Sequence, residues 1–138
     1  MINCEKVKFK DYTDQYGSLV PIEGQTDTGF PIRRIYYIFG VERGIRRGYH
    51  SHRDLHQILL CVSGSVTIQV RTNNDSEDIV LDNPSEGLYI GPMIWREMYD
   101  FSADAVLLVL ASEHYDESDY IRDFSAYKKE ASSYFEEK

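Results

Sequence analysis

The chain has few cysteines. It contains only Cys4 and Cys61 in 138 residues, and the two stand far apart, without the close spacing of a metal-binding motif. This scarcity argues against a disulfide framework and against a zinc site built from cysteine. Cys61 lies inside an apolar run, so we expect it to be a small buried side chain.

Long hydrophobic runs are also absent. No segment approaches the roughly 18 apolar residues of a membrane span, and the first residues lack a basic region followed by an apolar stretch. We therefore expect a cytoplasmic protein with no membrane partner.

Positive charge is scarce, with 15 Lys and Arg against 23 Asp and Glu and a formal net charge of −8. Because a polyphosphate backbone normally needs a cationic surface, nucleic acid is not an expected partner. The arginines are nevertheless clustered, and within about twenty positions the chain has Arg33, Arg34, Arg43, Arg46, Arg47 and Arg53. They either form a cationic pocket for a phosphorylated metabolite or pair with nearby carboxylates as ordinary surface residues.

The length suits a single domain, residues 1–138, since domains commonly run about 100 to 150 residues. Short apolar runs separated by Gly, Asn, Asp and Pro recur through residues 1–115, which is typical of an all-β sandwich or barrel. The candidate strands are 18–22, 34–39, 56–62, 65–71, 78–81, 87–90, 97–101 and 105–111. The uninterrupted apolar run 106–110 predicts a strand covered on both sides.

The pattern changes after residue 115. Aromatic and aliphatic residues are then spaced for one face of a helix, with Asp116, Ser118 or Asp119 as its cap. We predict a C-terminal amphipathic helix over 116–138 that packs on the barrel or on a partner subunit.

The most informative motif is the pair His50 and His52. Alternation along a strand points both imidazoles to the same side of a sheet. Such a pair can divide the work of taking up and returning protons, or it can bind a metal. The alternative is a chance pair on a solvated strand face.

The spacing of Gly44, His50, His52, Gln57 and Gly64 resembles the first motif of the cupin superfamily of β-barrels. In many cupins a Glu stands at the place of Gln57, and a third His on a distant strand completes a metal site. Here that strand reads Trp95-Arg96-Glu97. The resemblance therefore implies a cupin-type jelly roll without a full metal set, and we predict neither a metal nor a cofactor. The remaining imidazoles are His56 and His114, and we expect His56 to make a local hydrogen bond at a strand end.

Longer stretches resemble the sugar-nucleotide 3,4-ketoisomerases, which are small cupins acting on dTDP-4-keto-6-deoxy-D-glucose. The similar segments are 33–39, 47–52, 57–64, 81–84, 87–98 and 110–122. The resemblance implies a metal-independent shift of the keto group from carbon 4 to carbon 3 through an enediol or enediolate. It also implies a homodimer with exchanged N-terminal strands.

Carried over by position, the resemblance makes His50 the base at carbon 3 and His52 the relay between the two sugar oxygens. It places Tyr37 beside them, and it makes Arg34 and Arg47 the expected contacts to the diphosphate. The alternatives are a core aromatic for Tyr37 and a loop surface residue for Arg47.

Two further positions bear on the configuration at carbon 4. The galacto-type enzymes carry an Arg before Gly-Ser-Leu and a His after the Trp, where this chain has Tyr16 and Arg96. The chain therefore resembles the branch giving the gluco product, dTDP-3-keto-6-deoxy-D-glucose, which is then transaminated for the 3-amino sugar of a surface glycan. Three alternatives stay open: the galacto product, a noncatalytic cupin that binds nucleotide sugars, and a metal-dependent cupin oxygenase. For Arg96 itself, pairing with Glu97 or another rim carboxylate is the alternative to a role with substrate.

Overall fold

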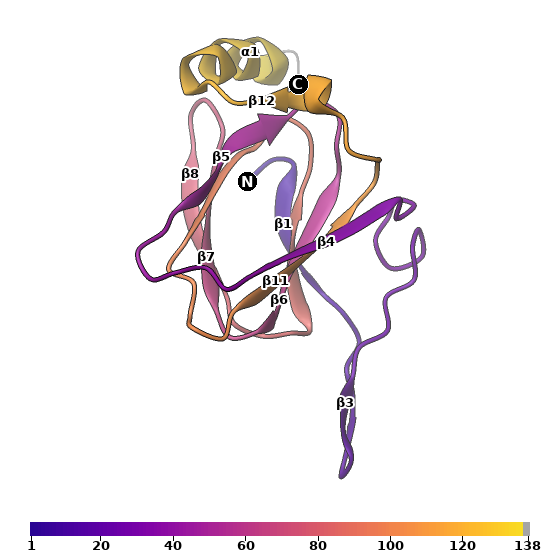
Figure 1. Ribbon diagram of the computed structural model, residues 1–138. Coiled ribbons are helices and arrows are strands. Elements are labelled where there is room, and N and C mark those ends of the chain that lie inside the picture. The colour runs from indigo at the N-terminus through magenta and orange to yellow at the C-terminus, as the bar shows by residue number, and fades with distance from the viewer. Residues whose placement is uncertain (137–138) are drawn as a thin grey trace.

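Two antiparallel sheets face each other and enclose the interior of the protein (Figure 1). The computed structural model describes residues 1–136. One five-stranded sheet has the order β1-β9-β6-β11-β4 and the other the order β12-β5-β10-β7-β8. The elements are β1 Cys4–Lys8, β2 Tyr12–Asp14, β3 Gly17–Leu19, β4 Arg34–Phe39, β5 Arg47–His52, β6 Gln57–Ser63, β7 Val66–Arg71, β8 Ser76–Leu81, β9 Glu86–Ile90, β10 Trp95–Tyr99, β11 Val106–Ala111, the 3-10 helix η1 Glu117–Asp119, β12 Tyr120–Ile121 and α1 Phe124–Glu136. This arrangement confirms the predicted all-β, cupin-type barrel with a C-terminal helix.

The core lies between the two sheets and follows from the alternation of apolar residues along the strands. On β7, Val66, Ile68 and Val70 point inward and are at most 1% exposed. The apolar run of β11 is covered on both sides, as predicted, because Leu107 packs in the core while Leu110 packs in a second cluster on the outer face. The barrel interior is therefore filled by side chains.

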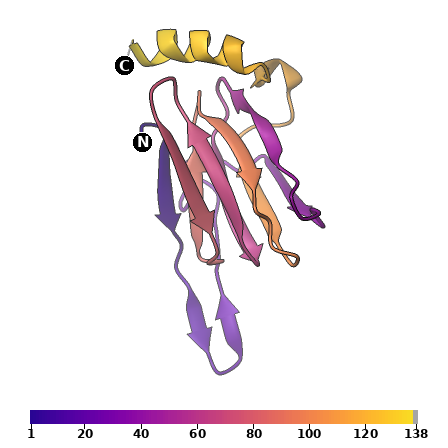
Figure 2. The same cartoon turned by 90° about the vertical axis from the view of Figure 1, so that its left-hand side faces the viewer.

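Seven of the eight candidate strands lie within two residues of observed ones. The exception is 18–22, because β3 ends at Leu19 and the next apolar residues, Val20 and Ile22, cover the outer sheet face instead. The short hairpin of β2 and β3 projects away from the barrel (Figure 2).

The C-terminal helix begins later than predicted. It starts at Phe124 rather than at 116, because Glu117–Asp119 form a 3-10 turn and Tyr120–Ile121 form the short strand β12. Asp116 does act as a cap, but for the 3-10 turn, and Asp123 accepts a hydrogen bond from the backbone N–H of Ala126 at the start of α1. The last two residues of the predicted helix, 137–138, lie outside the described residues.

Helix α1 lies across one end of the barrel (Figure 2). Its residue Tyr127 is fully buried, and the Tyr127 hydroxyl donates to the backbone oxygens of Arg71 and Met93, at 2.8 and 2.9 Å. The helix thereby holds the preceding strand, β12, against β5, with Tyr120 paired to His52. Among residues 1–136, no helix is long and apolar enough to cross a membrane.

Candidate active site

Two histidines of β5 share one side of the strand. The ring centroids of His50 and His52 lie 4.9 Å apart, with the planes nearly perpendicular. His52 is only 1% exposed, whereas His50 is partly buried. The prediction that alternation brings both imidazoles together is therefore confirmed.

A β-bulge directly precedes the pair. The pairing of β5 with β10 shifts register here, and the φ angles of Gly48 and Tyr49 are 96° and 56°. A Cβ at Gly48 would lie 2.9 Å from the backbone oxygen of Arg96, so only glycine fits this close approach. Such a bulge re-aims the side chains that follow it, here the two imidazoles.

Hydrogen bonds fix the tautomer of each ring. His50 Nδ1 lies 3.1 Å from the backbone oxygen of Gly48, and His52 Nδ1 lies 3.2 Å from Oδ2 of Asp119. Because a carbonyl and a carboxylate can only accept, both Nδ1 atoms carry the hydrogen and both Nε2 atoms keep a lone pair. The buried Nε2 of His52 has no hydrogen-bond partner within the described part of the chain.

Burial keeps both rings neutral. It lowers the pKa of His50 from 6.5 to about 3, and the nearby charge of Arg96 adds to the shift. The pKa of His52 is lowered for the same two reasons. The contact between His52 and Asp119 is therefore a hydrogen bond from a neutral ring rather than an ion pair, and the site presents two bases.

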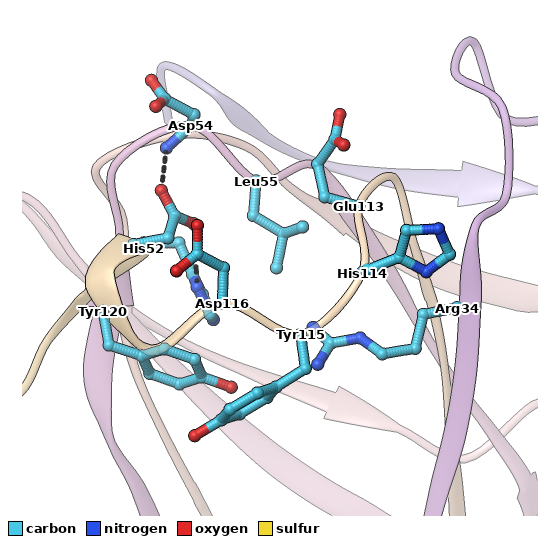
Figure 3. A pocket seen from close by; sticks show the side chains of 10 residues that line it. Arg34, His52, Asp54, Leu55, Glu113, His114, Tyr115, Asp116 and Tyr120 are labelled. Carbon is cyan, nitrogen blue, oxygen red and sulfur yellow. Dashed lines mark hydrogen bonds and ion pairs between the residues drawn. The ribbon is translucent and has the colours of Figure 1, made fainter.

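Tyr120 of β12 covers both rings, with its centroid 4.2 Å from that of His52 and 5.0 Å from that of His50. Together with Arg34 and Tyr115 it lines two cavities. The first cavity, of about 500 Å³, borders His52 and is rich in carboxylates (Figure 3). The second, of about 350 Å³, borders His50.

The second cavity is cationic. It is lined by Arg34, Arg47 and Arg122. The guanidinium of Arg34 faces the rings of Tyr36 and Tyr115 at 5.3 and 5.6 Å, and its buried Nε has no hydrogen-bond partner among residues 1–136. A buried donor without an acceptor is costly, so this cavity suits an anionic ligand.

A chain of hydrogen bonds runs behind His50. Arg96 Nη1 donates to Gln57 Oε1 at 2.5 Å, and Gln57 Nε2 donates to the hydroxyl oxygen of Tyr36 at 3.1 Å. Arg96 and Gln57 are each 1% exposed. Within residues 1–136, no group of three His, Cys, Asp or Glu side chains could hold a metal ion.

Comparison with known proteins accounts for this combination of barrel and paired histidines. The family model described as "FdtA: WxcM-like, C-terminal" matches residues 2–132. The chain belongs to this family. A TDP-4-oxo-6-deoxy-alpha-D-glucose-3,4-oxoisomerase of Aneurinibacillus thermoaerophilus is 46% identical over 123 residues, which are 89% of this chain and 88% of that protein.

Solved structures of such enzymes are also similar to this chain. The 3,4-ketoisomerase QdtA of Thermoanaerobacterium thermosaccharolyticum, in complex with TDP, gives a TM-score of 0.96 at 53% identity, over 98% of both chains. The TDP-quinovose 3,4-ketoisomerase WlaRB of Campylobacter jejuni gives a TM-score of 0.90 at 40% identity, over 94% of this chain and 99% of its own. The resemblance inferred from the sequence is thus confirmed for nearly the whole of this member of the FdtA-like family.

The structure corrects the position of the tyrosine expected beside the histidines. Tyr37 points to the outer face of β4, where it is 61% exposed and lies against Phe39. The neighbouring Tyr36 points inward and lines the cavity that borders His50. The expectation for Tyr37 is therefore wrong, and Tyr36 occupies the place it predicted.

The expected substrate-binding residues divide into two groups. Arg34 and Arg47 line the cavity beside His50, and their expected contact with the diphosphate stays a prediction. Arg96 lies inside the barrel, bonded to Gln57 and to a backbone oxygen, so its expected direct contact with substrate has no open path within this chain. Its pairing with Glu97 is also absent, because Glu97 binds Arg46 instead. Tyr16, 87% exposed, lies in the turn between β2 and β3 and lines neither cavity.

Several residues of the site were not predicted. Asp119, Tyr120 and Arg122 come from the segment expected to be helical, and they reach the histidines only because β12 pairs with β5. Their only signal in the sequence is the resemblance of residues 110–122 to the ketoisomerases. His56 lies at a strand end, as expected, and its Nδ1 is 2.7 Å from the hydroxyl of Tyr89. This hydrogen bond is not local, because Tyr89 belongs to β9 and is 33 residues away in the chain.

Proposed function

We propose that this protein is a sugar-nucleotide 3,4-ketoisomerase that converts dTDP-4-keto-6-deoxy-D-glucose into dTDP-3-keto-6-deoxy-D-glucose. The observation that carries the proposal is the pair of neutral imidazoles with both Nε2 lone pairs unengaged by protein donors, beside a cationic cavity. The relatives support the choice of substrate. QdtA has been solved with TDP, and its histidine-to-asparagine variant with TDP-4-keto-6-deoxyglucose.

In the proposed reaction two protons are transferred, and no metal takes part. The hydrogen on carbon 3 is acidic because it is adjacent to the carbon 4 carbonyl. His50 Nε2 takes it, the electron pair forms a double bond between carbons 3 and 4, and the carbonyl oxygen becomes an oxyanion. His52 Nε2 carries the hydroxyl proton from the oxygen on carbon 3 to the oxygen on carbon 4. The gluco configuration requires a proton on the opposite face of carbon 4 from the face at which His50 took the carbon 3 hydrogen. This proton comes from solvent while carbon 3 becomes the carbonyl, and His50 releases its own proton to solvent.

The cationic cavity supplies the binding energy for the nucleotide. Arg34 and Arg47 are the proposed ligands of the diphosphate, and Arg122 is added to them from the structure. Arg122 is held at 2.7 Å by Glu117 and lies over the ring of Tyr120 at 4.2 Å. Fixing the diphosphate here holds the sugar still against the histidines, which lowers the entropic part of the barrier.

We further propose the gluco configuration at carbon 4, for which Tyr16 and Arg96 are the proposed determinants. Quinovose has the gluco configuration, and the similarity to a TDP-quinovose ketoisomerase supports this choice. The buried, permanently charged Arg96 is a poor proton donor, so the proton reaches carbon 4 from another group or with the sugar in a different orientation.

The proposed working form is a homodimer that exchanges its N-terminal hairpin. Strand β4 is an edge strand, and its outer face exposes Ile35, Tyr37 and Phe39 at 58, 61 and 68%. Such a contiguous apolar stripe is typical of an interface. Of the N-terminal strands, β1 pairs with β9 of its own chain, which leaves the projecting hairpin to carry Tyr16 to the partner's site.

The cytoplasm is the compartment we propose. Both cysteines are unpaired and buried, as is common for proteins of a reducing compartment.

The first test is an NMR time course of metal-stripped protein with dTDP-4-keto-6-deoxy-D-glucose in deuterated buffer, coupled to a 3-aminotransferase. We expect deuterium at carbon 4 and a gluco-configured 3-amino product. A galacto product would preserve the reaction and reverse the stereochemistry. No conversion would refute the proposal, and conversion only after a divalent metal is added would refute its metal independence.

A further inference from the structure

The hydrogen bonds behind His50 have a fixed direction. A guanidinium has no acceptor, so the contact of 2.5 Å from Arg96 can only end on the amide oxygen of Gln57. The amide nitrogen of Gln57 therefore faces Tyr36 and donates to its hydroxyl oxygen at 3.1 Å. Because that oxygen accepts, the hydroxyl hydrogen of Tyr36 must point elsewhere.

Burial makes this arrangement rigid. Arg96 and Gln57 are each 1% exposed, and the remaining guanidinium contacts go to the backbone oxygen of Ile94 at 3.2 and 3.3 Å. Within residues 1–136, no carboxylate forms an ion pair with Arg96. Its full charge thus polarises the amide of Gln57 in a region of low dielectric.

The hydroxyl hydrogen of Tyr36 has no protein acceptor in the described part of the chain. Tyr36 lines the same cavity as His50, which is where the sugar would lie. Burial raises the pKa of Tyr36, so the hydroxyl stays protonated and remains a donor at neutral pH.

We propose that Gln57 is a positioning residue. By donating to the hydroxyl oxygen of Tyr36, it directs the hydroxyl hydrogen into the cavity, where Tyr36 donates to the oxyanion of the enediolate. This inference rests on the proposed ketoisomerase function and adds two residues to it. Tyr36 keeps its proton in this contact and acts only as a hydrogen-bond donor. The developing negative charge gains a preorganised donor that is itself polarised, through Gln57, by the buried cation Arg96.

The decisive variant is Gln57→Glu, which has nearly the same shape but reverses the hydrogen bond. A carboxylate accepts from Arg96 and also from Tyr36, so the hydroxyl hydrogen turns away from the cavity. We expect kcat to fall by about 10²-fold, as for the loss of one oxyanion donor, with little change in KM. Tyr36→Phe should lose a similar factor.

The double variant separates this account from a general effect of the new charge. In the Tyr36→Phe background, Gln57→Glu should cause almost no further loss, because the donor it turns away is already missing. A matched control is Gln69→Glu, which places a carboxylate beside Arg46, whose Nη2 donates to Gln69 at 3.0 Å outside both cavities. Its turnover should equal that of the wild type, and thermal melting confirms that each variant folds.

The inference would be overturned if Gln57→Glu kept wild-type turnover. It would also be overturned if Gln57→Glu lowered kcat by the same factor in the Tyr36→Phe background as in the wild type. A carbon-13 NMR titration of labelled tyrosine tests the hydrogen bond without substrate. Gln57→Glu should raise the pKa of Tyr36, because its hydroxyl then donates to a carboxylate, and an unchanged pKa would also overturn the inference. If the wild type itself fails to turn over the sugar, the proposed function falls, while this titration still decides the direction of the bond.

Discussion

Replacing Asp119 by Asn should inactivate the relay histidine by changing its tautomer. Oδ1 of Asp119 accepts the backbone N–H of Asp54 at 2.9 Å, and Oδ2 accepts from His52 Nδ1 at 3.2 Å. An Asn has only one oxygen, and the backbone N–H of Asp54 holds it because that group can only donate. The amide NH₂ then faces His52. The imidazole avoids two opposed donors by moving its hydrogen to Nε2, the atom that must accept the sugar's hydroxyl proton.

The expected size of the effect follows from the role of that atom. General acid–base groups commonly contribute about 10²- to 10⁴-fold to the rate, and a blocked Nε2 removes this contribution while the ring stays in place. We therefore expect kcat to fall by about 10²- to 10⁴-fold. KM should change little, because the base His50 and the arginines of the cationic cavity are untouched.

The assay combines turnover with nitrogen-15 NMR of the histidine side chains, which reports the protonated nitrogen directly. Asp116→Asn is the matched control, because Asp116 lines the same cavity but its bonds go to Ser118. Asn also caps well, so this control should keep wild-type turnover. Asp119 does not set the tautomer if His52 keeps its hydrogen on Nδ1 in Asp119→Asn. His52 is not the relay if the tautomer changes and kcat stays within a few-fold of the wild type.

Four other outcomes are expected. His50→Asn should suppress turnover while sparing binding of the nucleotide sugar, measured by calorimetry, and near-normal turnover would refute its role as base. As the pH falls, His50 should bind a proton in the unfolded chain before it does so in the folded protein, because folding lowers its pKa from 6.5 to about 3. The free energy of unfolding should then decrease below pH 6.5 and down to about 3, by about 1.4 kcal/mol per pH unit for each such histidine, and constant urea midpoints would contradict this. Tyr127→Phe, which removes a donor shared by two backbone oxygens, should cost about 1 to 3 kcal/mol in the same assay, and an unchanged midpoint would show that the hydroxyl does not secure the helix. Combining Tyr16→Arg with Arg96→His should move the product towards galacto, and an unchanged product would remove both as determinants.

The barrel could be predicted from the sequence because apolar and polar residues alternate along its strands and turn residues separate them. β7 shows this best, with Val66, Ile68 and Val70 inward and polar residues between them. β4 has no such alternation. Its residues are apolar or aromatic on both faces after Arg34, so the sequence has no signal to tell whether Tyr36 or Tyr37 points inward.

The second half of the site could not be predicted for a different reason. A two-residue strand such as β12 is too short to show any period, and Asp119 lies 67 residues from the His52 it contacts. The substitution of Arg96 for a metal-ligating His was visible in the sequence. Its complete burial without a carboxylate was not, because side-chain partners across a barrel depend on tertiary packing.

The unpaired charge of Arg96 has a consequence for engineering. Burying a cation costs several kcal/mol, and replacing buried ion pairs by well-packed apolar residues is often neutral or stabilising by about 1 to 4 kcal/mol. Directed evolution for heat resistance alone would therefore favour losing this side chain. A thermostable catalyst for the gluco product therefore has to keep Arg96 and gain its stability elsewhere, on the surface or beneath the helix.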